Sequence, residues 1–197
     1  MANNSENLTT TSAPKTGGPL FRGATSATLP TDAASELGAD FTNLGRISDD
    51  GAKLSDSIST EEIKDWEGVT VATPLKEKKD ECELTLIESL NVEVLKTVYG
   101  SENVSGTLET GIKVESKPHN PKHYAYVLDT IEGEDSDVLH RKVYPNAAIT
   151  KVGDQTLVRN KLVSYPITLT ALSDSKGNTH YDYYIKKGAA STEESGT

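Results

Sequence analysis

Apolar and polar residues alternate along much of the chain between residues 41 and 186, a period of two that predicts β-strands with one buried face. The cleanest alternation lies in residues 161–172, "KLVSYPITLTAL", where Val163, Tyr165, Ile167, Leu169 and Ala171 share a face. Further strands are predicted in "CELTLIE" (82–88), "YAYVLDTI" (124–131), "DVLHRKVY" (137–144), "AAITKV" (147–152) and "THYDYYI" (179–185). The pattern therefore favours a mainly β fold.

One stretch has a helical pattern instead, at residues 91–99. Val94, Leu95 and Val98 lie at helical spacing, Asn91 can cap the start, and Gly100 can end the helix. Many closely spaced strands with a single helix predict a β-sandwich or an open barrel with one short flanking α-helix.

Two interruptions of the strand pattern carry their own predictions. Asp50-Gly51, inside "FTNLGRISDDGAKLSDSI", is predicted to form a hairpin turn, because this pair favours positive φ. Pro145 interrupts the strand pattern of residues 137–152 and has no backbone donor, so it should lie at an edge or a bulge. The acidic turn 132–137 lacks the spacing of an EF-hand loop, so a solvated hairpin tip is favoured over an ion site.

The two ends of the chain are polar and of low complexity. We expect a flexible N-terminal arm at 1–40, a β-sandwich domain at 41–186 and a flexible C-terminal tail at 187–197. The segment from Leu20 to Asp40 is either a loose tail or an extended arm that becomes ordered on another surface.

Composition and charge exclude several classes of function. Hydrophobic residues are only 35% of the chain, and the net charge of −10 argues against affinity for nucleic acid. No apolar run is as long as a membrane span, and the N-terminus does not resemble a signal peptide, so a cytoplasmic origin is expected.

The sequence offers little catalytic chemistry. The single cysteine, Cys82, is expected to be a buried strand residue. His119 and His123 have the spacing of some zinc ligands, but Pro118 and Pro121 forbid the helix that would align them. His140 and His180 are expected to be surface or edge residues. We therefore predict no enzyme, no catalytic or metal residues and no cofactor.

Trp66, the only tryptophan, has two possible roles. Core packing is its default role, whereas an exposed Trp66 would indicate an interface anchor. The neighbouring stretch from Asp49 to Trp66 is polar and rich in loops.

The order of elements from residue 41 to 185 resembles the tail tube (major tail) protein of long-tailed bacteriophages with flexible tails. The resemblance is carried by "TNLGRISDDG", "CELTLIES", "ESLNVEVLKTVYG" and "YPNAAITKVGD" followed by "YPITLTAL". It implies a structural virion protein, made in the bacterial host cytoplasm, that self-assembles into hexameric rings. The rings stack into a hollow tail tube through which DNA passes without sequence-specific contacts.

The resemblance also implies partners and an assembly surface. The partners are other copies of the chain, a tape measure protein inside the tube, and tail terminator and tail-tip proteins, with no membrane contact. The candidate subunit-interface residues are Phe21, Leu29, Asp49, Asp50, Ile58 and Trp66. An acidic lumen would repel DNA within about a Debye length, roughly 8 Å, although the sequence does not identify the luminal acids.

Two other functions remain open on the sequence alone. A β-sandwich carbohydrate-binding or adhesion module would present clustered exposed aromatic residues. A tail terminator or head–tail ring protein would form rings that do not stack indefinitely. Glycan binding would favour the first alternative, and rings that never elongate would favour the second.

Overall fold

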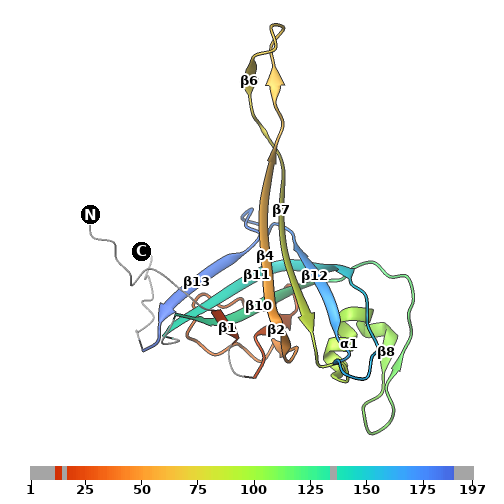
Figure 1. Ribbon diagram of the computed structural model, residues 1–197. Helices are drawn as coiled ribbons and strands as arrows, with labels where there is room; N and C mark the ends of the chain where they lie inside the picture. The colour runs from red at the N-terminus through yellow and green to blue at the C-terminus, as the bar shows by residue number, and fades with distance from the viewer. Residues whose placement is uncertain (1–11, 15–16, 134–136, 189–197) are drawn as a thin grey trace.

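The computed structural model describes residues 12–14, 17–133 and 137–188, and in this part of the chain the fold is mainly β with one short α-helix (Figure 1). This confirms the predicted fold class. The strands are β1 (Ser12–Pro14), β2 (Leu20–Gly23), β3 (Thr42–Asn43), β4 (Ile47–Thr60), β5 (Ile63–Lys64), β6 (Thr70–Ala72), β7 (Leu75–Leu86), β8 (Val104–Ser105), β9 (Lys113–Val114), β10 (His123–Glu132), β11 (Val138–Val152), β12 (Tyr165–Ala171) and β13 (Tyr181–Lys186).

The main sheet is antiparallel, open and branched. Its strand order is β3-β2-β10-β11-β12-β7-β4, while β1 also pairs with β10 and β13 also pairs with β11. β5–β6 and β8–β9 are separate two-stranded pairs. The branch at β11 arises because the first half of this strand, residues 138–143, pairs with β13, and residues 147–152 pair with β12.

Pro145 lies where β11 changes partners. Pro145 and Asn146 together oppose the single residue Ala125 of β10, between the pairs Tyr126–Tyr144 and Tyr124–Ala147. Two residues opposite one is the definition of a β-bulge, which tolerates a residue without a backbone donor. The prediction for Pro145 is confirmed, and "RKVYPNAAITKV" is a single strand with a bulge in it.

The core lies between the curled sheet and the helix α1 (Val92–Tyr99). It includes Leu84 and Leu86 of β7, Ile167 and Leu169 of β12, and Val94 of the helix, all buried. The alternating burial along β12 confirms the face predicted from the sequence. The helix is also confirmed: the Asn91 side chain accepts a hydrogen bond from the Glu93 amide, and Gly100 follows its last turn at φ 90°.

The N-terminal region contributes a core strand. Leu20 of β2 is fully buried, and β2 pairs with β10 between Leu128 and Ala125. Arg22 extends from this strand to the helix, where it donates to Glu93 at 2.9 Å and to Thr97 at 2.5 Å. The segment 1–40 thus contains a strand of the sheet, and its division from the domain at residue 40 stays a prediction. Residues 1–11 and 189–197 lie outside the described residues.

The predicted turn at Asp50-Gly51 is wrong. These residues lie within β4, where Gly51 takes φ 72° and the pairing with β7 shifts between Ile47 and Ala52. The glycine therefore serves an irregularity in a continuing strand. The chain reverses only after residue 60, so β4 and β7 form a hairpin that extends far beyond the sheet (Figure 1).

Candidate assembly surface

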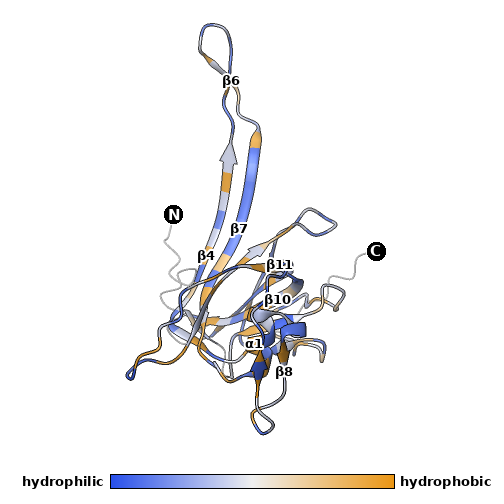
Figure 2. Ribbon diagram, turned by 90° about the vertical axis from the view of Figure 1, so that its right-hand side faces the viewer, coloured by the Kyte–Doolittle hydropathy of each residue, from blue (hydrophilic) through white to orange (hydrophobic). Residues whose placement is uncertain are grey.

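The outer part of the β4–β7 hairpin has no packing partner in the chain. Every residue from 53 to 79 is exposed, although the two strands stay paired from Ala52–Leu84 out to Thr60–Leu75. The short strands β5 and β6 continue the projection to its tip. Both views show this hairpin standing clear of the rest of the molecule (Figures 1 and 2).

Large apolar side chains are exposed along this projection. Ile58 is 65% exposed and Trp66 is fully exposed. A single exposed apolar side chain is common on a protein surface, but here several lie on one element. The complete group from strand to tip is Leu54, Ile58, Ile63, Trp66, Val69, Val71 and Leu75. Figure 2 shows orange, hydrophobic segments along the hairpin out to its tip. A series of exposed apolar residues on one element is typical of an interaction surface.

The tip itself has a defined turn. The Asp65 carboxylate accepts hydrogen bonds from the backbone amides of Glu67 (3.0 Å) and Val69 (2.8 Å). Gly68, at φ 82°, donates to the Asp65 carbonyl. Aspartate and glycine supply the turn chemistry here that Asp50-Gly51 does not. Trp66 is therefore presented to solvent on an ordered turn, and its default assignment to the core is wrong.

The predicted interface residues fall in three places. Ile58 and Trp66 lie on the projecting hairpin, while Asp49 and Asp50 are exposed at the irregularity near its base. Phe21 is half-buried in β2, and half-buried Leu29 lines a groove with Pro145 and Tyr183. The structure thus groups four of the six on one hairpin and separates the other two from it. Whether any of them contacts another subunit stays a prediction.

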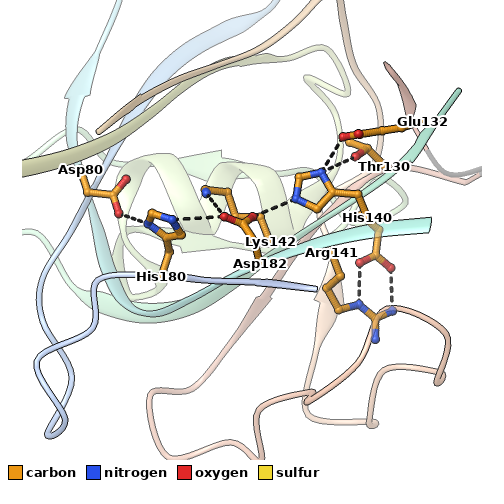
Figure 3. A network of polar contacts seen from close by, with 9 residues as sticks. Asp80, Thr130, Glu132, His140, Arg141, Lys142, His180 and Asp182 are labelled. Carbon is orange, nitrogen blue, oxygen red and sulfur yellow. Dashed lines mark hydrogen bonds and ion pairs between the residues drawn. The ribbon is translucent and has the colours of Figure 1, made fainter. Parts of the chain in front are cut away.

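A polar network that is partly buried fixes the last strand, β13, to the sheet (Figure 3). Asp182 of β13 accepts hydrogen bonds from His140 and Lys142 of β11, each at 2.8 Å. His180 lies between Asp182, at 3.2 Å, and buried Asp80 of β7, at 2.5 Å. Charge-assisted bonds of this kind are short and strong, so they tie β13 to both β11 and β7.

The network shifts the pKa of two of its members. Burial raises the pKa of Asp182, but hydrogen bonds from His140 and Lys142 outweigh it and lower the value to about 2. Burial lowers the pKa of His140, but its bonds to Asp182 and Glu132 outweigh that effect and raise the pKa above 6.5. His140 is buried, so its prediction as a surface or edge residue is wrong. His180 is half-buried and directly precedes β13, which in the described structure pairs only with β11, so its position is consistent with the predicted edge residue. The partners of both histidines are remote in sequence, which the strand pattern cannot reveal.

A second buried charge holds the N-terminal region. Arg141 is completely buried and donates two hydrogen bonds to Asp129, at 2.7 and 2.8 Å (Figure 3). Its remaining nitrogen donates to the carbonyl oxygens of Asp32 (3.0 Å) and Ser35 (2.9 Å). This fixes the loop before β3 against the sheet.

No three His, Cys, Asp or Glu residues in the described part of the chain are grouped to hold a metal ion. Cys82 is buried, as predicted, and burial raises its pKa to about 12, far from a reactive thiolate. His123 begins β10 and contacts Asn146. Of the acidic turn, residues 134–136 lie outside the described part of the chain, and Asp137 pairs with Lys186. No described helix has the length and apolarity needed to cross a membrane.

The projecting hairpin with its exposed apolar side chains, and the open edge of the sheet, are features typical of interaction surfaces. Comparison with protein families agrees: the model of the phage tail tube protein family matches residues 1–195, so the chain belongs to this family. It is a structural component of the phage tail tube, and therefore of the virion tail. No curated protein is similar enough in sequence to refine this assignment.

Proposed function

We propose that copies of this chain close into hexameric rings, and that the rings stack into a hollow tube through which phage DNA passes. The observation that supports stacking is the free hairpin. Its outer residues, 53–79, are ordered by their own ladder yet bury nothing within the chain. Apolar side chains exposed along such an element gain stability only when another surface covers them.

Ring closure is supported by the sheet edges. β4 pairs only with β7, so the outer edge of a strand of 14 residues is unpaired along its length within the described structure. An exposed edge of this length is a template for strands of another chain, and a closed ring satisfies it without open-ended aggregation. The six-fold symmetry itself rests on the resemblance to flexible-tailed phages.

The charge of the chain suits a conduit. With a net charge of −10, the chain would present a repulsive rather than an adhesive wall to DNA phosphates. A tape measure protein inside the tube, and terminator and tip proteins at its ends, are the further partners of such a tube. The luminal acids are not assigned.

Negative-stain electron microscopy of the purified full chain, at high concentration and after prolonged incubation, tests this function. We expect hollow tubes or stacked rings of uniform diameter. Rings that never elongate, even when incubated with preformed tubes, would indicate a terminator or head–tail ring instead. Binding to a glycan array without any assembly would indicate an adhesion module.

A further inference from the structure

The loop between β11 and β12, residues 153–164, is a second surface with uncovered apolar side chains. Leu157 is 75% exposed and Leu162 is 70% exposed, and Val158 is also exposed. A backbone bond from Gly153 to the Pro166 carbonyl, at 2.7 Å, closes the base of the loop. The chain itself leaves these residues uncovered, as it does those of the hairpin.

The loop and the hairpin tip carry opposite charge. The loop, residues 153–164, has two cations, Arg159 and Lys161, and one acid, Asp154. Between residues 60 and 75 it has four acids, Glu61, Glu62, Asp65 and Glu67, and one lysine. In the described structure, Arg159, Lys161, Glu61 and Glu67 form no side-chain ion pair.

The two surfaces lie far apart in the molecule. The hairpin tip is at the top of Figure 1, while the loop that joins β11 to β12 lies on the right, beside the helix α1. The two therefore cannot meet within one chain. A contact between them joins one copy to the next head to tail, which is the heterologous geometry that repeats without limit along an axis.

We propose that the hairpin tip of one copy docks on the 153–164 loop of a copy in the adjacent ring. This inference rests on the proposed stacking and names the surface that receives the hairpin. Trp66 covers Leu157 and Leu162, and Glu61 and Glu67 pair with Arg159 and Lys161. The arrangement has the apolar centre and charged rim of a specific interface, with tryptophan and arginine at its most sensitive points.

Paired charge reversals test the docking. We expect the tip variant E61K/E67K and the loop variant R159E/K161E each to lower the yield of sedimentable tubes by about tenfold or more, because like charges across an interface disfavour it strongly. The chain that carries all four changes should recover most of that yield. The matched control is E36K/D40K, which reverses two exposed acids away from both surfaces and should leave the yield unchanged.

Cysteine cross-linking locates the contact directly. Cys82 is buried, so introduced cysteines react without competition from a native thiol. We expect full chains with W66C/L157C to form a ladder of covalent multimers with a short thiol-specific cross-linker. W66C/L108C, with a similarly exposed site on the β8–β9 turn, should give at most dimers.

The outcomes separate this inference from the proposed function. Two results would overturn the docking and leave the tube intact, provided that the wild type forms tubes. One is a tube yield that neither charge-reversal variant lowers, and the other is a lowered yield that the variant with all four changes does not recover. A ladder from W66C/L29C instead of W66C/L157C would place the tip in the groove beside Tyr183, and would also overturn it. If the wild type forms no tubes, the presence or absence of the W66C/L157C ladder still decides whether the tip meets the loop.

Discussion

The two halves of β7 differ in burial although they belong to one strand and share one partner. From Asp80 to Leu86 the inner half is buried at every second residue, and Leu84 and Leu86 pack into the core. From Leu75 to Lys79 the outer half is exposed at every position, yet its ladder with β4 continues. The difference is the layer behind the strand. The ladder with β4 alone orders the outer half, and a two-stranded hairpin with no packed face adds little stability by itself. Its apolar residues contribute stability only when another surface covers them.

This contrast divides the chain into a part that folds and a part that assembles. The inner half of the hairpin should determine the free energy of unfolding, and the outer half should determine association between copies. Changes in the packed region and in the projecting hairpin should therefore affect stability and assembly differently.

The largest effect is expected from removing the outer hairpin. Replacing residues 57–79 by Asn-Gly joins Asp56 to Asp80, which are paired neighbours, through a two-residue turn. The shortened chain should keep its circular dichroism spectrum and its cooperative thermal transition but form no tubes in the electron microscope. A shortened chain that is unfolded would show that the outer half is part of the folding unit.

The next largest effect is expected from breaking a buried ion pair, compared with breaking an exposed one. Arg141→Met leaves Asp129 buried without its cation and should reduce the free energy of unfolding by about 3–5 kcal/mol. Lys78→Met removes an exposed pair with Asp56 on the hairpin and should change it by about 0–1 kcal/mol. Urea titration of both variants measures the comparison. Equal losses of the free energy of unfolding in the two variants would contradict the exposed position of the Lys78–Asp56 pair.

Apolar truncations should separate the two properties. Leu86→Ala should cost about 2–5 kcal/mol in the free energy of unfolding, because it leaves a cavity in the core. Ile58→Ala should alter it by less than about 0.5 kcal/mol, since the side chain is 65% exposed, but should lower the tube yield. A stable Leu86→Ala variant, or an Ile58→Ala variant that assembles at wild-type yield, would contradict the division.

The smallest effect is expected from pH, and it belongs to the inner region. The pKa of His140 is raised above 6.5, so its contribution to stability is complete below that value and is lost as pH rises through the folded-state pKa. The lowered pKa of Asp182, about 2, gives stability that is present above 3.8 and is lost as pH falls toward 2.

His140→Gln should remove the part of the pH dependence of stability that appears as pH rises. Thermal unfolding measured from about pH 6 to about pH 9 should show the wild type losing stability more steeply than the variant. Thr130, Glu132 and Asp182, which face His140 from the neighbouring strands, remain in the variant and act as the constant background. Parallel profiles would mean that His140 does not titrate in this range.

Local patterns predicted much of the fold. The helix at 92–99, the alternating face of β12 and the bulge at Pro145 each depend on residues close together in sequence. The hairpin could not be recognised in the same way. Its alternation looks like that of a half-buried strand, and only the tertiary structure shows that no second layer covers residues 53–79.

The remaining errors have the same origin. Asp50-Gly51 has turn chemistry, but its neighbours continue to pair with β7, and the reversal falls at Asp65 instead. Trp66 is apolar enough for a core, yet the turn that holds it lies at the most remote point of the chain from that core. For the candidate surface, Ile58 and Trp66 were found because the surrounding stretch is polar, and that signal is local. The receiving loop was missed, because nothing local distinguishes its exposed leucines from core residues.

The central claim is that residues 53–79 are covered only in the assembled tube. Hydrogen exchange measured by mass spectrometry on the soluble chain and on assembled tubes tests it most directly. Peptides from the outer hairpin should exchange rapidly in the soluble chain and become strongly protected in the tube, while peptides from residues 80–86 should be protected in both. Unchanged exchange in the outer hairpin after assembly would contradict the account.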